Sequence, residues 1–321
     1  MTLPATFTTG GLVAPSPFLL APMEGVSDAG FRRICAEAGA GLGYTEMVRA
    51  RGVVRRNNST LALIDTVDAE APAGVQLLVV NEGELRATFE VLAELAQTTH
   101  PHFARIAAVD LNFGCPSKDV ITIGAGPAML KRRAKLRAIF EALADVKRRR
   151  VLPSVVSVSA KIRLGLNDAE RAHKVYLPVV EMANDTLDHI VVHARHAKQR
   201  SRDRPDWSAI GEAKAHSKIP IVGNGDVSTR ADALHMHEET GCDGVMVARA
   251  AVRDPCCFFA LRGEVEPTAV EKLARAEAAF ARFAPTRDKH RVFREELLER
   301  LRAQVAGRQV EVRIPDNAHL R

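Results

Sequence analysis

The sequence predicts a TIM barrel, an eight-stranded parallel β-barrel surrounded by helices, with a short helical extension after it. Eight short apolar runs alternate with helical segments, and no Gly-x-Gly-x-x-Gly follows the first run. Such alternation implies a parallel sheet, and eight β–α units are the number that closes a TIM barrel. A doubly wound open sheet is the alternative, and the missing dinucleotide fingerprint speaks against it.

The predicted strands are short apolar runs that end at turn or helix signals. They cover residues 18–21, 42–45, 73–77, 106–111, 155–161, 189–193, 220–223 and 244–248. Helices are predicted at 28–37, 82–97, 127–150, 168–183 and 229–240. The second of these has Leu85, Phe89 and Leu92 on one face, the spacing of an amphipathic helix.

The chain is predicted to divide into a catalytic barrel at 1–260 and a helical extension at 261–321. The barrel length suits one domain, and the residues after Thr268 are rich in Arg and Glu with a helical apolar pattern. That segment is long enough for two or three helices packed on the barrel, which is too little for an independently stable domain.

Composition places the chain among globular proteins with a sizeable core. Of its 321 residues 46% are hydrophobic and 26% charged, and aromatic residues are few, with 12 Phe, 2 Tyr and 1 Trp. A core built on small and branched aliphatic side chains is usual in parallel sheets that helices cover.

The charge suits a polyanionic partner. The formal net charge is +6 and the sequence pI is about 9.2. There is no signal peptide and no apolar run long enough to span a bilayer, so we expect a cytoplasmic protein with no membrane partner. Five cysteines without a Cys-x-x-Cys pair argue against a disulfide framework and against a metal site.

Polar residues stand at the carboxyl ends of the predicted strands, where the active sites of TIM barrels lie. They are Pro22 with Met23, Gln76, Asn112 with Cys115, Lys161, His193, Asn224-Gly225-Asp226 and Ala248 with Arg249. Taken singly, each also has a structural explanation: a lone lysine can extend to solvent, and Asn-Gly-Asp forms tight turns. Together on one rim they predict a cofactor site.

The stretch from Asp110 to Lys118 is the centre of this rim. Gly114 permits a sharp turn and Pro116 fixes the backbone beyond it, so the thiol of Cys115 is expected on a loop. Read alone, the stretch also fits a strand end with a buried cysteine. The surrounding rim favours a chemically active thiol.

An ordered set of motifs carries a resemblance to a known family. The motifs are Ala21-Pro-Met-Glu-Gly-Val-Ser-Asp28, Thr45-Glu-Met47, Leu111-Asn-Phe-Gly-Cys-Pro-Ser-Lys118, Gly124-Ala-Gly126, Lys161-Ile-Arg-Leu-Gly165, Val192-His-Ala-Arg195, Asp206-Trp207, Asn224-Gly-Asp226 and Thr240-Gly-Cys-Asp-Gly-Val-Met246. From about residue 18 to 259 the chain resembles the flavin-dependent tRNA-dihydrouridine synthases, with a lean to the bacterial C-type members.

The resemblance implies reduction of the uridine C5=C6 bond in the D-loop of tRNA, with FMN as cofactor and NADPH as electron donor. Reduced FMN would give a hydride from N5 to C6, and Cys115 would protonate C5. An ordinary thiol has a pKa of about 8.5, so it is protonated near neutral pH. Lys161 would stabilise the anionic reduced flavin, Gln76 and His193 would hydrogen-bond its rings, and Asn112 would hold the uracil edge.

Further residues follow from the same resemblance. Met23 would pack against the flavin, and the phosphate would be held by backbone groups around Gly225 and Ala248 together with Arg249. Ala21, Pro22, Asn224 and Asp226 are also expected in the cofactor site. Because a flipped uridine needs a basic collar, RNA contacts are expected from Arg49, Arg51, Arg163, Arg195, Lys198 and Arg200. We expect a monomer.

Two departures from the family pattern lead to further expectations. The family tends to carry basic residues after the cysteine, where this chain has Val120-Ile-Thr-Ile123, so that loop is expected to contact RNA less strongly. The extension is also short. The alternatives are an FMN barrel acting on ribosomal RNA or a free pyrimidine, or an RNA-binding homologue without turnover. The rim arginines argue against a free pyrimidine, and Cys115 with Lys161 argues against the last alternative.

Overall fold

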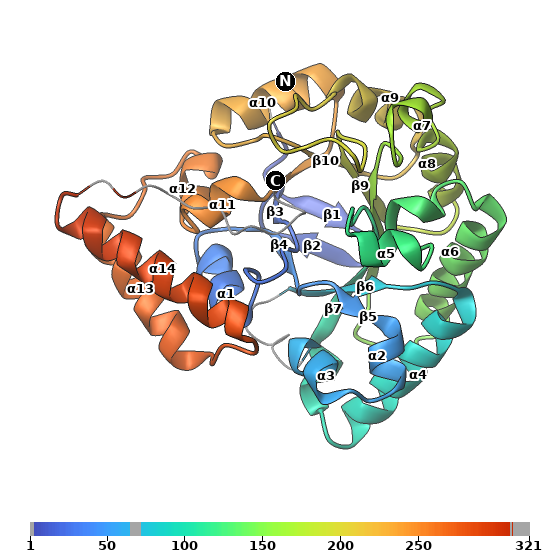
Figure 1. The fold of residues 1–321 in the computed structure, drawn as a ribbon, viewed down its shortest axis with the longest axis horizontal. Helices are drawn as coiled ribbons and strands as arrows, with labels where there is room; N and C mark the ends of the chain where they lie inside the picture. Colours follow the sequence, from blue (N-terminus) through green and yellow to red (C-terminus); the bar gives the residue numbers. More distant parts are fainter. Residues whose placement is uncertain (1–2, 65–71, 309, 311–321) are drawn as a thin grey trace.

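Eight parallel strands close into a barrel in the computed structural model, which describes residues 3–64, 72–308 and 310 (Figure 1). In order around the barrel they are β3 (Phe18–Leu20), β4 (Leu42–Tyr44), β6 (Ala73–Leu78), β7 (Ile106–Phe113), β8 (Ser157–Arg163), β9 (His189–His193), β10 (Ile221–Asn224) and β11 (Gly244–Val247). The last strand pairs in parallel with the first, which closes the ring. The predicted TIM barrel is confirmed, and each predicted run contains a strand.

Helices cover the outside of the barrel. They are α1 (Ala29–Glu37), α2 (Ala50–Val54), α3 (Asn58–Ile64), α4 (Glu82–Gln97), α5 (Lys118–Thr122), α6 (Arg133–Arg148), α7 (Asp168–Ala172), α8 (Leu177–Ala183), α9 (Ser208–His216), α10 (Arg230–Thr240), α11 (Arg249–Arg253) and α12 (Cys257–Arg262). Leu85, Phe89 and Leu92 of α4 are fully buried, as their spacing predicts. No described helix is long and apolar enough to cross a bilayer.

Two predicted helices differ from the observed ones. The helix predicted at 127–150 begins only at Arg133, because Gly126 has a φ of +58° and residues Gly126–Met129 form the separate 3₁₀ turn η3. The helix predicted at 168–183 is broken between α7 and α8, where Lys174 has a φ of +50°. Pro178 lies in the first turn of α8, a position where proline favours a helix start.

The strand predicted at 155–161 is also shifted. β8 begins at Ser157 and extends to Arg163, because its last two residues still pair with neighbours: Ile162 with Phe113 and Arg163 with His193. Lys161 therefore lies inside the strand. Its side chain still reaches the carboxyl end of the barrel, together with that of Arg163.

An N-terminal hairpin, β1 (Phe7–Thr9) and β2 (Leu12–Ala14), was not predicted. It covers the opposite, amino-terminal end of the barrel. The Thr9 hydroxyl lies 2.9 Å from Ser157 Oγ and 2.7 Å from His189 Nδ1, both at strand starts. Among the described residues, the hairpin thus packs across the strand starts at this end, opposite the polar strand ends.

The C-terminal helices α13 (Ala269–Arg282) and α14 (Asp288–Val305) pack against α1 and against each other. Two buried contacts fix α14: His290 Nε2 lies 2.8 Å from Glu46 Oε1, and Arg294 donates to Asp28 at 2.5 Å. Glu46 also accepts from the backbone N–H of Gly25. The extension is thereby joined to the loops that follow β3 and β4. Its residues 309 and 311–321 lie outside the described part.

Candidate active site

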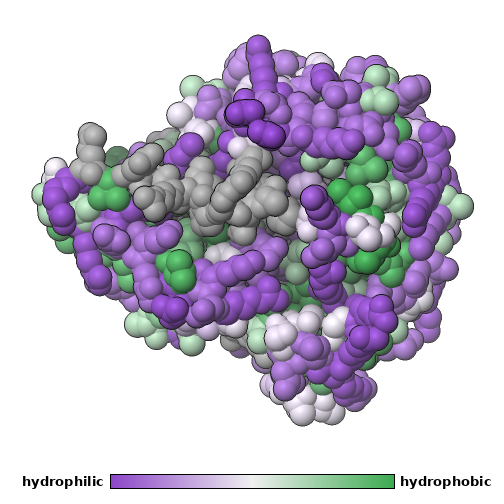
Figure 2. Space-filling model, viewed as in Figure 1, coloured by the Kyte–Doolittle hydropathy of each residue, from purple (hydrophilic) through white to green (hydrophobic). Residues whose placement is uncertain are grey.

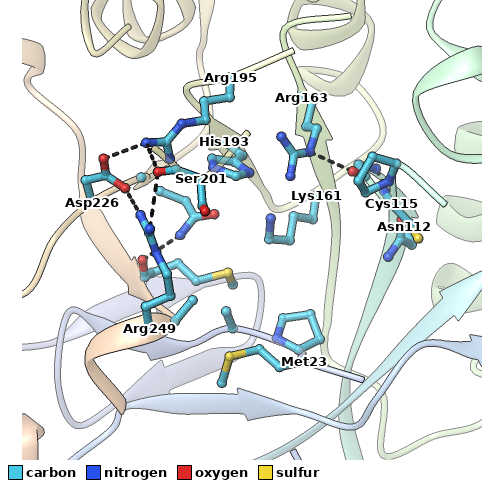
Figure 3. Close-up of a pocket in the computed structure, with 18 of the residues that line it drawn as sticks. Met23, Asn112, Cys115, Lys161, Arg163, His193, Arg195, Ser201, Asp226 and Arg249 are labelled. Carbon is cyan, nitrogen blue, oxygen red and sulfur yellow. Dashed lines mark hydrogen bonds and ion pairs between the residues drawn. The ribbon is translucent and has the colours of Figure 1, made fainter. Parts of the chain in front are cut away.

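A pocket opens at the carboxyl end of the barrel, on the rim where the sequence placed the polar strand ends. It holds about 1150 Å³ of empty space, part of it open to solvent. Every residue predicted to hold the cofactor lines it, and so do Asn112 and Cys115. Figure 3 shows Cys115 and Asn112 on one side, Asp226 and Arg249 on the other, and Lys161 with His193 between them.

Cys115 sits on a loop that is fixed by a neighbouring amide. The side-chain oxygen of Asn112 accepts the backbone N–H of Gly114 at 3.1 Å and that of Cys115 at 2.9 Å. Both are the donors that a turn after a strand would otherwise leave unpaired. Cys115 is 8% exposed and packs with Val120 of α5. The loop therefore holds the thiol at the pocket wall with little freedom.

A buried carboxylate continues this arrangement into the barrel. The other side-chain atom of Asn112, its Nδ2, donates to Gln76 Oε1 at 2.8 Å, and Gln76 Nε2 donates to Asp110 Oδ2 at 2.7 Å. Asp110 Oδ1 accepts from Ser159 Oγ at 2.7 Å. Asp110 is completely buried, and burial raises its pKa from 3.8 to about 6. At pH 7 it is therefore still mainly a carboxylate.

Lys161 and His193 supply a cation and a neutral ring to the pocket floor. Burial and the charge of Arg163 lower the pKa of Lys161 from 10.5 to about 8. Burial, followed by the charges of Arg163 and Lys161, holds the pKa of His193 well below its usual range. Near neutral pH Lys161 is charged, while His193 has one N–H donor and one acceptor nitrogen.

The opposite end of the pocket is built from ion pairs. Arg195 and Arg249 both pair with the carboxylate of Asp226, and both donate to the carbonyl of Ser201, at 3.1 and 3.2 Å. Asp226 has a φ of +56°, in the left-handed region that Asp tolerates better than most residues. This end therefore holds two guanidinium groups against one carboxylate, and Arg249, at 23% side-chain exposure, is the more accessible of the two to an anion.

The residues predicted to contact RNA fall into two groups. Arg163, Arg195 and Arg200 line the pocket, whereas Arg49, Arg51 and Lys198 lie outside its lining with exposed side chains. Arg163 is engaged within the protein, where it donates to the carbonyl of Gly114 at 2.8 Å and to that of His196 at 3.3 Å.

Residues 120–123, expected as a loop, form the end of α5 and its C-cap Ile123, beside the pocket on the rim. Val120 is fully buried against Cys115, while Ile123 is 51% exposed. Figure 2 shows an apolar patch where Figure 1 places α5, on a face that is otherwise mainly hydrophilic. This stretch of the rim thus offers apolar surface, in keeping with the expected lack of a basic contact there.

Several lining residues were not predicted to bind cofactor or substrate. They are Glu24, Met47, Gly114, Pro116, Gln199, Ser201, Val227, Ser228 and Met246. Met47 belongs to the Thr45-Glu-Met47 motif, which was a usable signal. The role of Asp110 was also missed, although an acidic residue inside an apolar run indicates a buried partner. No group of three or more potential metal ligands occurs in the part of the chain that is described.

Comparison with known proteins identifies relatives of the whole barrel. The family model described as dihydrouridine synthase (Dus) matches residues 19–311. A probable tRNA-dihydrouridine synthase of Aquifex aeolicus is 35% identical over 240 residues, 75% of this chain and 71% of that protein. One of Mycobacterium tuberculosis (strain H37Rv) is 32% identical over 261 residues, 78% of this chain but only 63% of the relative's length.

Solved structures support the fold alone. Morphinone reductase superposes with a TM-score of 0.57 at 11% identity, covering 82% of this chain and 90% of that one. An old yellow enzyme homologue from Zymomonas mobilis gives 0.52 at 12% identity, with 79% and 90% covered. The fold is shared with these proteins, and the match of the family model over residues 19–311 shows that this chain belongs to the dihydrouridine synthase family.

Proposed function

We propose that the chain reduces the C5=C6 bond of a uridine in the D-loop of tRNA, with FMN as cofactor, NADPH as electron donor and Cys115 as general acid. The observation that carries this proposal is the pocket, in which a loop-held thiol faces a buried lysine across one cavity, with an arginine pair at the far end. Family membership supplies the reaction class.

The donor set of the pocket suits FMN. Lys161 and neutral His193 offer donors and an acceptor to the pyrimidine part of a flavin, and Gln76, bonded to Asn112 and Asp110, has the second hydrogen of its Nε2 left to donate. Arg249, beside Ala248 and Gly225, offers a charged donor to a phosphate. Pro22 and Met23 would provide apolar contact. Bound FMN, once reduced by NADPH, would supply the hydride to C6 of the uridine.

The chain's own residues would perform the rest of the reaction. Cys115 would give its proton to C5, a contribution that is typically about 10²–10⁴-fold for a positioned acid. Lys161, charged below a pH of about 8, would stabilise negative charge on the neighbouring ring. The Asn112 amide already holds the cysteine loop through its oxygen, so only the second hydrogen of its Nδ2 is left to contact a uracil edge.

Arg49, Arg51, Lys198 and Arg200 are exposed on or near the rim, so they would guide the RNA backbone by charge. Arg163, which bonds the carbonyl of Gly114 beside Cys115, would act close to the reacting nucleotide, whereas Arg195 lines the pocket at its Arg249 end. The proposal also places the protein in the cytoplasm as a monomer, acting on tRNA through the barrel and its helical extension.

The test is a single-turnover reaction. FMN-loaded protein is reduced by NADPH without oxygen and mixed with unmodified tRNA. We expect flavin reoxidation together with the mass gain of two hydrogens on one tRNA nucleoside. Matched substrates are tRNA with its D-loop uridines changed to cytidine, a ribosomal RNA fragment and uridine monophosphate. Reoxidation by either of the last two but not by tRNA would assign the site to the alternative substrate and overturn the tRNA proposal.

A further inference from the structure

The interior of a TIM barrel is normally filled by branched apolar side chains. This one contains a hydrogen-bonded polar chain, which we name the amide chain: Ser159, Asp110, Gln76 and Asn112, ending at the backbone N–H of Cys115. Gln76, Asp110 and Ser159 are at most 1% exposed, and Asn112 is 8% exposed. Buried polar groups in such a chain are costly unless each one is paired, and here each is.

The direction of every bond in the amide chain is fixed from its two ends. At one end the backbone N–H groups of Gly114 and Cys115 require an acceptor, so the oxygen of Asn112 faces them and its Nδ2 faces Gln76. At the other end the Asp110 carboxylate can only accept, so Nε2 of Gln76 faces it. The two amides between them can therefore adopt only one orientation.

We propose that Asp110 is a positioning residue for the cysteine loop: its carboxylate sets the orientation of Gln76 and Asn112, and through them the place of Cys115. The inference rests on the proposed function. It adds a residue that contacts neither cofactor nor substrate, since Asp110 is absent from the lining of the pocket. Without the carboxylate, the side-chain amide of Gln76 can flip. Its Nε2, a donor, then takes the place of Oε1, which accepts from Asn112 Nδ2.

Substitutions can break the hydrogen bonds of the amide chain or preserve them. Asp110→Ala removes its acceptor end. Asp110→Asn conserves it, because the amide oxygen can accept from Gln76 while the Ser159 hydroxyl accepts from the new N–H₂ group. Gln76→Leu cuts the next link and carries the test if Asp110→Ala does not fold. Ser157→Ala is the matched control, since it removes a fully buried hydroxyl of β8 that bonds Thr9 at the other end of the barrel.

The first measurement needs no RNA. Alkylation of Cys115 by iodoacetamide is followed by peptide mass spectrometry in each variant. A loosened loop exposes the thiol, so Asp110→Ala and Gln76→Leu should raise the alkylation rate about tenfold, the effect of one net hydrogen bond. Asp110→Asn and Ser157→Ala should stay within about twofold of the parent protein.

The second measurement separates the two half-reactions. The Asp110 carboxylate also raises the pKa of Lys161, so both half-reactions are measured well below pH 8, where Lys161 stays charged in each variant. Reduction of the flavin by NADPH should then stay within about twofold in Asp110→Ala, whereas reoxidation by tRNA should slow about tenfold, and Asp110→Asn should restore it. The double variant Asp110→Ala with Asn112→Ala should be no slower than the slower single variant, because both act through one chain.

The inference is overturned if Asp110→Ala and Gln76→Leu leave alkylation of Cys115 unchanged, if Ser157→Ala raises it equally, or if the two single effects multiply in the double variant. Failure of the proposed function looks different. In that case the parent protein shows no reoxidation by any RNA, while the alkylation rates still report on Asp110.

Discussion

At the Cys115 end of the pocket, side chains are held by amide hydrogen bonds, whereas at the Arg249 end they are held by ion pairs. Asn112 and Gln76 each have one orientation and little exposure. Arg195 and Arg249 share one carboxylate and one carbonyl, and the carboxylate of Asp226 is 34% exposed. Hydrogen bonds of side-chain amides fix which atom faces which partner, while ion pairs near solvent tolerate rearrangement. The first end suits a proton transfer that needs exact placement, and the second suits the capture of an anion.

The largest effect should come from the Cys115 end. If Cys115 is the acid as proposed, Cys115→Ala should slow reoxidation of the reduced flavin by tRNA about 10²–10⁴-fold, because the thiol proton is lost, and should leave bound flavin in place. Stopped-flow absorbance of the flavin measures both. Cys257→Ala is the control, since that thiol lies outside the pocket lining and burial raises its pKa. Undiminished reoxidation in Cys115→Ala would remove the thiol from the role of acid.

Substitution at the Arg249 end should change the affinity for FMN and not the rate of the chemical step. Arg249→Ala should weaken FMN about 10–100-fold, the value of a hydrogen bond to a charged group. Riboflavin lacks the phosphate and is the matched ligand, so its affinity should change less than about twofold. Titration of apoprotein by flavin fluorescence gives both constants. Equal losses for the two ligands would show that Arg249 does not face the phosphate.

Lys161 lies between the two ends and should give a pH dependence. Its pKa is lowered to about 8 by burial and by Arg163, so its charge is present below that pH and lost above it. Reduction of the flavin by NADPH should therefore fall roughly tenfold between pH 7 and pH 9. An anionic flavin nearby would move this midpoint upward. In Lys161→Met the reduction rate should not fall over this pH range. If the variant shows the same fall as the parent protein, another group titrates.

Stability of the flavin-free protein should change in the opposite sense over this pH range. The pKa of a lysine in the unfolded chain is about 10.4, whereas that of Lys161 in the folded protein is about 8. Between these two pH values the unfolded chain binds more protons than the folded protein, so the free energy of unfolding increases as the pH rises. The thermal midpoint of the parent protein, compared with that of Lys161→Met, should rise across this range. A relative fall would contradict the burial of a charged lysine.

The smallest effects should come from the rim outside both ends. Arg51→Ala and Lys198→Ala should each reduce the salt dependence of tRNA binding by about one unit in the slope of log K against log salt, with little change in single-turnover chemistry. Lys218→Ala is the control, because this exposed residue precedes β10 at the amino-terminal end of the barrel. An equal change in all three variants would mean that the overall charge, and not the rim, binds RNA.

The sequence alone was sufficient for the barrel because its signals are local. Each strand is a short apolar run, and each rim residue lies at or near the end of one of them, so counting runs predicts both the closure and the shared rim. Helix bounds were less predictable at 127–150 and 168–183. There the helices are interrupted at single left-handed residues such as Lys174, for which the residue type gives no local signal.

The sequence thus determined the eight-stranded barrel, its polar rim and the placement of Cys115, Lys161, His193 and Arg249 on it. Tertiary structure decided what each of these side chains bonds to. Asp110 meets Gln76 from 34 residues away and Ser159 from 49, and Glu46 meets His290 from 244. Such pairs leave no periodic trace in the chain, because a hydrogen bond depends on distance and direction in space, and only the closed barrel with its docked helices brings these atoms together.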